Sequence, residues 1–289
     1  MIGFIFLRVF VTLFGILPFT IVYKISDLLS WTLYYVIRYR RVVVETQLKV
    51  SFPEKSEGEI KAIARKSYDN LGDIIVESIK GFSMPESEFS ERYKFVNPEV
   101  SLQYTQQGKC VIHSAAHYGN WEWGVITYAL AFPYPALGFY KPLSNKYNEK
   151  FTALKRGRFG FIMVPINNTS KAFEQYKKDP ATFVLVSDQS TWSDNAHWVH
   201  FLGQDTACPP GVDKYSRMLK CPVFYIHIQR IKRGYYEVVL HKLTDGNENL
   251  QEGVITERYM KKLESILKEK PEDWLWSHKR WKKKRVSMN

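Results

Sequence analysis

From residue 109 onward, short β-rich runs alternate with helical runs, and no other feature of the chain constrains its fold as strongly. The β-rich runs are short and apolar, and each of the helical runs has apolar residues at helical spacing. Strands that alternate with helices predict an α/β fold built on a parallel sheet. The predicted strands cover residues 110–115, 135–140, 161–166, 182–188, 222–231 and 235–243, and the predicted helices cover residues 121–131, 145–157, 170–179, 211–220 and 253–269.

The end of this series departs from a purely parallel arrangement. Only Arg233 and Gly234 separate the last two strands, and such a short turn joins antiparallel neighbours. The sequence therefore predicts an α/β fold with a mixed, largely parallel central sheet flanked by helices. No repeat or low-complexity linker interrupts residues 25–289, so we expect them to form one catalytic domain with a basic C-terminal tail.

The amino terminus predicts contact with a membrane. Residues 2–23 are almost wholly apolar, with Arg8 as their only charge, and about 20 apolar residues span a bilayer. We expect residues 1–24 to form an N-terminal membrane-anchor helix. Pro18 and Arg8 weaken a full span, so a transmembrane helix and a helix lying in the interface both stay open. The basic residues that follow predict a cytoplasmic location for this side: Lys24, Arg38, Arg40 and Arg41.

A helical segment precedes the alternating region. Ser56 followed by Glu59 is the pattern of a capping box, in which the two side chains bond to each other's backbone N–H groups. Apolar residues then recur at helical spacing as far as Ile79, and Gly81 is a residue that ends helices. The pattern predicts a helix over about residues 57–81.

Cysteine and charge bound the function classes. Cys110, Cys208 and Cys221 include no close pair, which argues against a disulfide framework or a structural zinc site and favours a reducing compartment. The formal charge of +12 predicts an anionic partner, such as an acidic membrane surface or a phosphorylated substrate. Residues 279–285 are nearly all Lys or Arg, as in segments that bind anionic membranes, and no nucleic-acid motif accompanies them. We expect the neighbouring tryptophans to lie at headgroup level: Trp274, Trp276 and Trp281.

The run His117 to Glu122 carries the strongest chemical pattern. His117 lies just past a predicted strand, Gly119 permits a turn, and Asn120 is a good helix N-cap. Ligands bind beyond the carboxyl ends of strands in such sheets. A neutral histidine accepts a hydroxyl proton near pH 7, and a carboxylate on its other ring nitrogen fixes the tautomer.

Simpler interpretations of the same residues stay open. Glu122 in a first helical turn stabilises a helix without any catalytic role. A histidine at a strand end is often only a hydrogen-bonded core residue. His113 and His117 are four residues apart, but on a strand that spacing separates them by about 13 Å, so we expect no metal site.

The motifs resemble, in order, those of the bacterial lipid A late acyltransferases (lauroyl and myristoyl transferases), within the glycerolipid-type acyltransferases that share a His-x4-Asp/Glu signature. HYGNWE resembles the His-x-x-x-Trp-Glu form of that signature. Leu202 stands where the family commonly has Phe, and Lys279 where it commonly has Arg. The remaining blocks that carry the resemblance are SFPEKS at 51–56, RGRFG at 156–160, SDQS at 187–190, FLGQDTACPPG at 201–211 and PEDWLWSHKRW at 271–281.

The resemblance implies transfer of a fatty acyl chain from acyl carrier protein, or from coenzyme A, to a hydroxyl of a phosphorylated lipid A precursor at the cytoplasmic face of the inner membrane. It implies that His117 is the general base and Glu122 its charge partner. Arg156, Arg158 and Asp188 match the family's later blocks and are predicted to bind substrate, with Asp188 orienting a site arginine. No metal or other cofactor is implied.

Three alternatives stay open at this stage. The chain is an acyltransferase acting on a lysophospholipid or an amino-acid lipid, a membrane-tethered basic binding protein without catalysis, or a metal hydrolase. The first shares the chemistry of His117, the second needs none, and the third needs a metal site.

Overall fold

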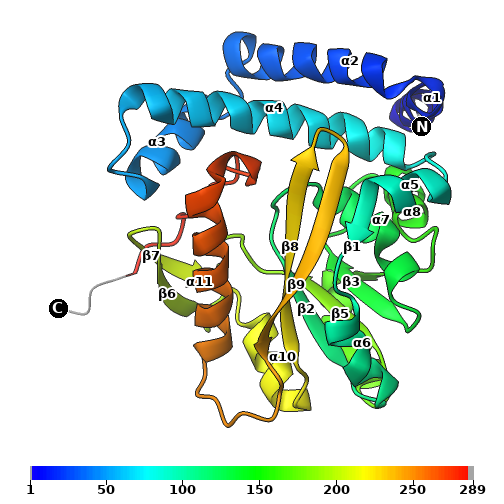
Figure 1. Ribbon diagram of the computed structural model, residues 1–289, viewed down its shortest axis with the longest axis vertical. Coiled ribbons are helices and arrows are strands. Elements are labelled where there is room, and N and C mark those ends of the chain that lie inside the picture. The colour runs from blue at the N-terminus through cyan, green and yellow to red at the C-terminus, as the bar shows by residue number, and fades with distance from the viewer. Residues whose placement is uncertain (1, 286–289) are drawn as a thin grey trace.

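A seven-stranded sheet forms the centre of the computed structural model, which describes residues 2–285 and the side chains of residues 7–285 (Figure 1). Its strand order is β1-β9-β8-β2-β5-β3-β4. Every neighbouring pair is parallel except β8 and β9, so the predicted mixed, largely parallel sheet is confirmed. The strands are β1 (Tyr93–Phe95), β2 (Val111–Ala115), β3 (Ala136–Tyr140), β4 (Ile162–Pro165), β5 (Thr182–Val186), β8 (Val223–Lys232) and β9 (Tyr235–Thr244), with β6 (His197–Phe201) and β7 (Gln204–Cys208) in a separate antiparallel pair.

Helices cover both faces of the sheet, as the alternating sequence predicts. The strand β2 shows why: Val111 and Ala115 pack into the cluster that contains α7, whereas Ile112 packs into the cluster with α9 and α10. A strand buried on both faces is rich in apolar residues, and the polar residues of β2, His113 and Ser114, are buried as well. The helices are α1 (Ile2–Ile16), α2 (Phe19–Trp31), α3 (Arg41–Ser51), α4 (Glu57–Gly81), α5 (Glu86–Arg92), α6 (Glu99–Gln106), α7 (Trp121–Ala131), α8 (Lys146–Arg156), α9 (Thr169–Tyr176), α10 (Gly211–Leu219) and α11 (Val254–Glu269).

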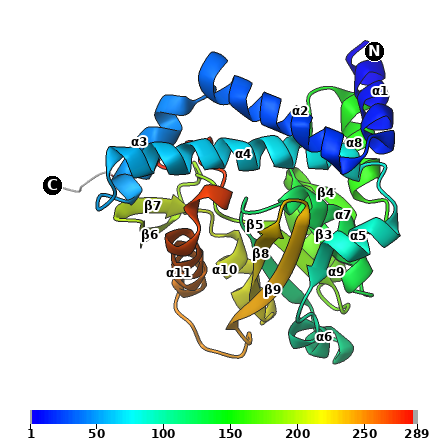
Figure 2. The ribbon, with the colours of Figure 1, turned by 45° about the horizontal axis from the view of Figure 1, so that its top comes forward.

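The long helix α4 crosses the edge of the sheet at which β2 ends (Figures 1 and 2). It spans Glu57–Gly81 and begins with the predicted capping box, since the Ser56 hydroxyl accepts from the Glu59 N–H and the Glu59 carboxylate accepts from the Ser56 N–H. Asp73 on α4 binds Arg230 near the end of β8. This ion pair holds α4 over the carboxyl edge of the sheet, where sheets of this kind bind ligands.

The predicted N-terminal anchor helix is not found as a single span. Among the described residues, no helix has the length and apolar character needed to cross a membrane. The apolar run is divided into α1 and α2 at Pro18, which has no N–H to donate and begins the next helix as its N-cap. The 15 residues of α1 are about 22 Å long, against about 30 Å for a hydrocarbon core.

Both N-terminal helices pack against α4: α2 runs along its outer side, and α1 crosses it steeply near its C-terminal end (Figure 2). Gly72 makes the close approach possible, because a Cβ there would lie 3.0 Å from the Ser26 carbonyl oxygen. The buried Lys80 ammonium donates to the carbonyl oxygens of Phe14, Gly15 and Leu17, which have no partner within α1. The opposite sides of α1 and α2 expose large apolar residues: Val9, Phe10, Leu13, Ile16, Ile21, Ile25, Leu28 and Trp31.

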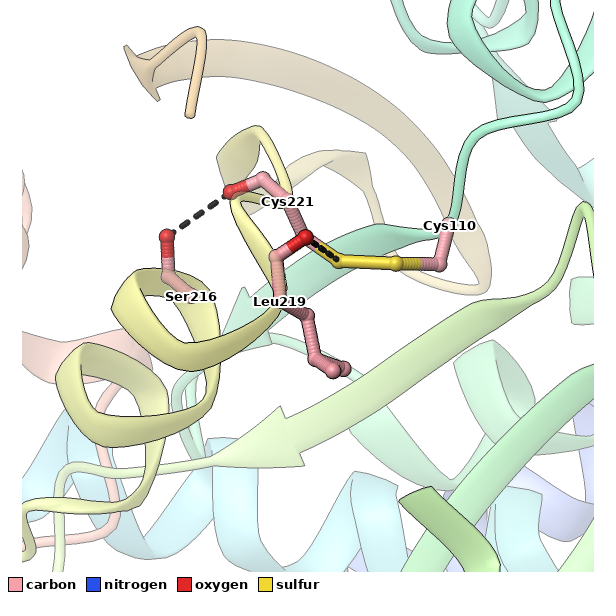
Figure 3. The surroundings of a disulfide bond; sticks show 4 residues. All are labelled: Cys110, Ser216, Leu219 and Cys221. Atoms are coloured by element: carbon pink, nitrogen blue, oxygen red, sulfur yellow. Dashed lines mark hydrogen bonds between the residues drawn. A yellow bond between two sulfur atoms is a disulfide. The ribbon is translucent and has the colours of Figure 1, made fainter. Parts of the chain in front are cut away.

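A disulfide joins Cys110 to Cys221, with the Cα atoms 5.8 Å apart (Figure 3). The argument against a disulfide is therefore wrong. The two residues are 111 positions apart in sequence, but each lies just before one of the neighbouring parallel strands β2 and β8. Parallel strands start at the same edge of a sheet, and this edge is opposite to the one that α4 crosses.

Candidate active site

The loop after β2 places His117 at the carboxyl edge of the sheet. Gly119 has a φ of +60°, and a Cβ there would meet the Ile228 side chain and carbonyl oxygen at 2.8 Å, so this turn requires glycine. Asn120 then caps α7, and its Oδ1 accepts from the Trp123 N–H at 2.9 Å. The predicted sequence of strand, tight turn and helix is confirmed.

A buried carboxylate on α4 holds this turn. Asn120 Nδ2 donates to Glu77 Oε2 at 2.6 Å, and the Tyr236 hydroxyl donates to the same oxygen at 2.8 Å. The Tyr23 hydroxyl of α2 donates to Glu77 Oε1 at 2.9 Å. Burial, and then the charge of Asp73, raises the pKa of Glu77 to about 7. The loop with His117 is thus fastened to α4, and through Glu77 to α2.

Asp188, which follows β5, is the carboxylate bonded to the His117 ring. Its Oδ1 lies 2.8 Å from His117 Nδ1, and its Oδ2 accepts from the His117 backbone N–H at 3.0 Å. Glu122, which the sequence predicts as the charge partner of His117, is not the group bonded to its ring: α7 points the Glu122 carboxylate at Arg156, although its charge still raises the pKa of His117. The structure also gives Asp188 a histidine as its partner where the sequence predicts an arginine.

The charges of this pair favour an ionised Asp188 and a more basic His117. Burial lowers the pKa of His117, but the charge of Asp188, the hydrogen bond to it and the charge of Glu122 together raise that pKa above its usual value. Burial raises the pKa of Asp188, but the charge and hydrogen bonds of His117 and the Trp274 indole lower it overall. With Nδ1 donating to Asp188, the Nε2 atom keeps its lone pair, and the Gln189 amide nitrogen is 3.3 Å from it.

The C-terminal segment bonds to both Asp188 and His117, which the sequence did not predict. The Trp274 indole donates to Asp188 Oδ2 at 2.8 Å, and the Leu275 N–H donates to the His117 carbonyl oxygen at 3.0 Å. Trp274 and Trp276 are buried, so the expectation that they lie at a headgroup level is wrong. Arg280 is also buried, with its guanidinium donating to the Ala207 carbonyl oxygen.

Both arginines that the sequence predicts as substrate-binding residues, Arg156 and Arg158, have partners within the protein. Arg156, at the end of α8, forms a bidentate pair with Glu122, at 2.7 Å from Nη2 to Oε1 and 3.0 Å from Nε to Oε2. Arg158 donates to the Met84 carbonyl oxygen and lies over the Phe159 ring. The pair of Arg156 with Glu122 is partly exposed, whereas burial lowers the pKa of Arg158.

An apolar cavity lies on the α7 side of the sheet and is separated from His117 by the Trp121 ring, so that neither His117 nor Asp188 is part of its wall. The Trp121 ring, whose centroid is 5.1 Å from that of His117, forms part of its wall. The cavity is about 50 Å³. Its remaining wall is formed by Tyr93, Phe95, Ala115, Gly124, Val125, Tyr128, Phe161, Val184, Val186, Ile226 and Ile228. A larger groove, of about 770 Å³, lies between the β6–β7 pair and α11, and its wall includes neither His117 nor Asp188.

His113 does not belong to the site. Its ring is fully buried, with Nε2 2.7 Å from the Ser101 hydroxyl and Nδ1 bonded to the Tyr128 hydroxyl. Burial lowers the pKa of His113 to about 3. Among residues 2–285, no group of three or more His, Cys, Asp or Glu side chains is placed to hold a metal ion.

Comparison with known proteins identifies the family. The sequence model described as "Bacterial lipid A biosynthesis acyltransferase" matches residues 1–283. The chain belongs to this family. It is therefore an acyltransferase of lipid A biosynthesis.

Curated relatives extend over most of the chain. A lipid A biosynthesis acyltransferase from Haemophilus influenzae is 22% identical over 281 residues, which cover 92% of this chain and 83% of the relative. The lipid A biosynthesis lauroyltransferase from Escherichia coli is 20% identical, covering 92% of this chain and 87% of the relative. The palmitoleoyltransferase from Escherichia coli is 22% identical, covering 86% and 81%.

Asn120 should contribute more to stability than an ordinary helix cap. We expect Asn120→Ala to lower the free energy of unfolding by about 2–3 kcal/mol, because it removes the cap of α7 and one of three donors to a buried carboxylate. Asn145→Ala is the matched control, since Asn145 caps α8 at an exposed site, and should cost about 1 kcal/mol. Urea unfolding at pH 8 measures both losses, and equal losses would contradict this role of Glu77.

Proposed function

We propose that this acyltransferase moves a fatty acyl chain from a thioester carrier to a hydroxyl of the lipid A precursor, with His117 as general base. The observation that carries the proposal is the pairing of His117 with Asp188 beside an apolar cavity. Asp188 holds the proton on Nδ1, so Nε2 is the atom that accepts a proton. Membership of the acyltransferase family supports the reaction class, and this geometry supports the proposed roles of the residues.

The reaction proceeds by direct transfer. His117 Nε2 takes the hydroxyl proton of the acceptor as its oxygen attacks the thioester carbonyl carbon. Backbone N–H groups in the first turn of α7 stabilise the negative oxygen of the tetrahedral intermediate. The carbon–sulfur bond then breaks, and the imidazolium returns its proton to the thiolate. The products are an ester and a free thiol, and no nucleophilic serine or cysteine is needed.

The surroundings of His117 suggest where each substrate lies. The apolar cavity takes the first part of the acyl chain, and the remainder requires neighbouring side chains to move, since the cavity is about 50 Å³. Arg156 binds a phosphate of the acceptor, because a guanidinium donates in a fork that matches phosphate oxygens. The exposed cations of the C-terminal segment attract an acidic acyl carrier protein: Lys279, Lys282, Lys284 and Arg285.

The protein meets the cytoplasmic face of the inner membrane through α1 and α2. Val9, Leu13 and Ile16 share one exposed side of α1, and Ile21, Ile25 and Leu28 share one of α2, at helical spacing. Such a face lies in the interface plane without spanning the bilayer. Lys24, Arg38 and Arg40 are exposed nearby and suit anionic headgroups.

Lipid A analysis tests the transfer. In a host strain that lacks its own late acyltransferases, the wild-type chain should add one secondary acyl chain, and His117→Ala should add none because no base remains. Mass spectrometry of lipid A reads the result, and a native-like melting curve shows that the variant folds.

A second assay identifies the donor: purified protein is given the same acyl chain on acyl carrier protein and on coenzyme A. If a lysophospholipid gained the acyl chain while lipid A stayed unchanged, the proposed acceptor would be wrong.

Replacement of the two carboxylates should separate their roles. We expect Asp188→Asn to lower kcat by about 10²–10⁴-fold, because Nδ1 loses the carboxylate that fixes its proton. The pKa of His117 should fall below its usual value, so the acidic limb of the pH–rate profile moves to lower pH. Glu122→Gln keeps a polar group beside Arg156 but removes the charge that holds it in place. We therefore expect KM for the acceptor to rise more than kcat falls. If Glu122→Gln lowered kcat more than Asp188→Asn does, then Glu122 and not Asp188 would be the partner of His117.

Membrane contact should depend on the exposed side of α2. We expect Ile21→Asp with Leu28→Asp to abolish most flotation with vesicles that contain anionic phospholipid, because charges cannot enter the apolar part of the interface. Met218→Asp is the control, since Met218 is equally exposed but lies on α10. Unchanged flotation of the double variant would refute contact through this face.

A further inference from the structure

The side chain of Gln189 faces the ring nitrogen that acts as base. Gln189 follows β5 and is half-buried, and its amide nitrogen lies 3.3 Å from His117 Nε2. Because Nδ1 donates to Asp188, Nε2 presents a lone pair, and an amide N–H faces that lone pair more favourably than the amide oxygen does. Gln189 thus donates to the atom that must accept the proton of the substrate.

The backbone on both sides of Gln189 is bonded in place. The Ser187 N–H donates to the Ala115 carbonyl oxygen at 3.2 Å, and the Ser190 N–H donates to His278 Nε2 at 3.2 Å. Burial lowers the pKa of His278 to about 4, so at neutral pH this histidine is uncharged and keeps the lone pair that accepts. The loop therefore holds the start of the Gln189 side chain, and the amide moves by rotation about the bonds of that side chain.

The amide lies where the reacting oxygens must come. A hydroxyl that gives its proton to Nε2 approaches to about 2.6–3.2 Å, so it displaces the Gln189 amide from its contact with the ring. In the tetrahedral intermediate the attacking oxygen and the former carbonyl oxygen are bonded to one carbon and lie side by side. Once Nε2 carries the proton, it is a donor and no longer attracts the N–H groups of the amide. The negative oxygen on the neighbouring carbon then offers these N–H groups a stronger acceptor.

We propose that Gln189 is a further catalytic residue, whose amide donates to the carbonyl oxygen of the thioester as that oxygen becomes negative. The inference rests on the proposed function, because it takes His117 Nε2 as the base. As the acceptor oxygen bonds to the thioester carbon, its proton goes to Nε2 and an electron pair moves to the carbonyl oxygen, which accepts from the amide. When the carbon–sulfur bond breaks, the carbonyl re-forms, the thiolate takes the proton from Nε2, and the amide returns to the ring.

Removal of the amide should slow transfer without weakening binding. The donor is the thioester of the acyl chain that mass spectrometry finds on lipid A, and we expect Gln189→Ala to lower the single-turnover rate about 10²–10³-fold. The KM should change little, because the lost bond forms only in the transition state. Gln189→Glu keeps the size of the side chain but has no N–H, and it should be at least as slow. A wild-type rate in either variant would overturn the proposal.

Gln229→Ala is the matched control. Gln229 is a half-buried residue of β8, and its amide nitrogen is also 3.3 Å from a histidine ring, at Nδ1 of His227. This variant should keep the wild-type rate. Nitrogen-15 NMR should find the His117 proton on Nδ1 in Gln189→Ala, because Asp188 is unchanged. Loss of that tautomer would make Gln189 only a support for the ring and would overturn the proposal.

Comparison with His117→Ala separates this proposal from the proposed function. If His117→Ala abolishes transfer and Gln189→Ala is as fast as the wild type, His117 is the base and the role of Gln189 is wrong. If Gln189→Ala is slow with an unchanged KM and His117→Ala keeps the wild-type rate, Gln189 donates to the negative oxygen in a reaction that uses another base, and the role of His117 is wrong.

Discussion

The structure of the site depends on one buried carboxylate, that of Asp188. It accepts from the ring and the backbone N–H of His117 and from the Trp274 indole. These three groups come from the end of β2 and from the C-terminal segment, while Asp188 follows β5. An ionised carboxylate in a buried place requires such partners. By satisfying it, the chain fixes three distant segments and sets the orientation of a single imidazole.

Glu77 has the corresponding role on the other side of the loop. It is buried on α4, and its donors are Asn120 in the loop, Tyr236 on β9 and Tyr23 on α2. The helix with the exposed apolar face is therefore two hydrogen bonds away from the N-cap of α7. A helix with an exposed apolar face and the loop that carries His117 thus share one buried polar cluster on α4.

Much of the fold can be predicted from local sequence patterns, but contacts between residues far apart in the sequence cannot. The helix 57–81 and the alternating elements follow from spacing, caps and turns within short windows. The sequence predicts a partner for His117 within the same motif, but the first turn of α7 directs Glu122 towards α8, and the carboxylate bonded to the His117 ring is 71 residues away. The bond between Cys110 and Cys221 depends on strand order, which spacing along the chain does not reveal. The apolar amino terminus has the composition of an anchor, but Pro18 divides it.

The tautomer of His117 shows which carboxylate holds its ring. Nitrogen-15 NMR of the protein labelled at histidine distinguishes a protonated Nδ1 from a protonated Nε2 near pH 8. We expect His117 to carry its proton on Nδ1 in the wild type and in Glu122→Gln, and Asp188→Asn to disturb this preference. A wild-type ring protonated on Nε2, or a preference lost in Glu122→Gln and kept in Asp188→Asn, would contradict it.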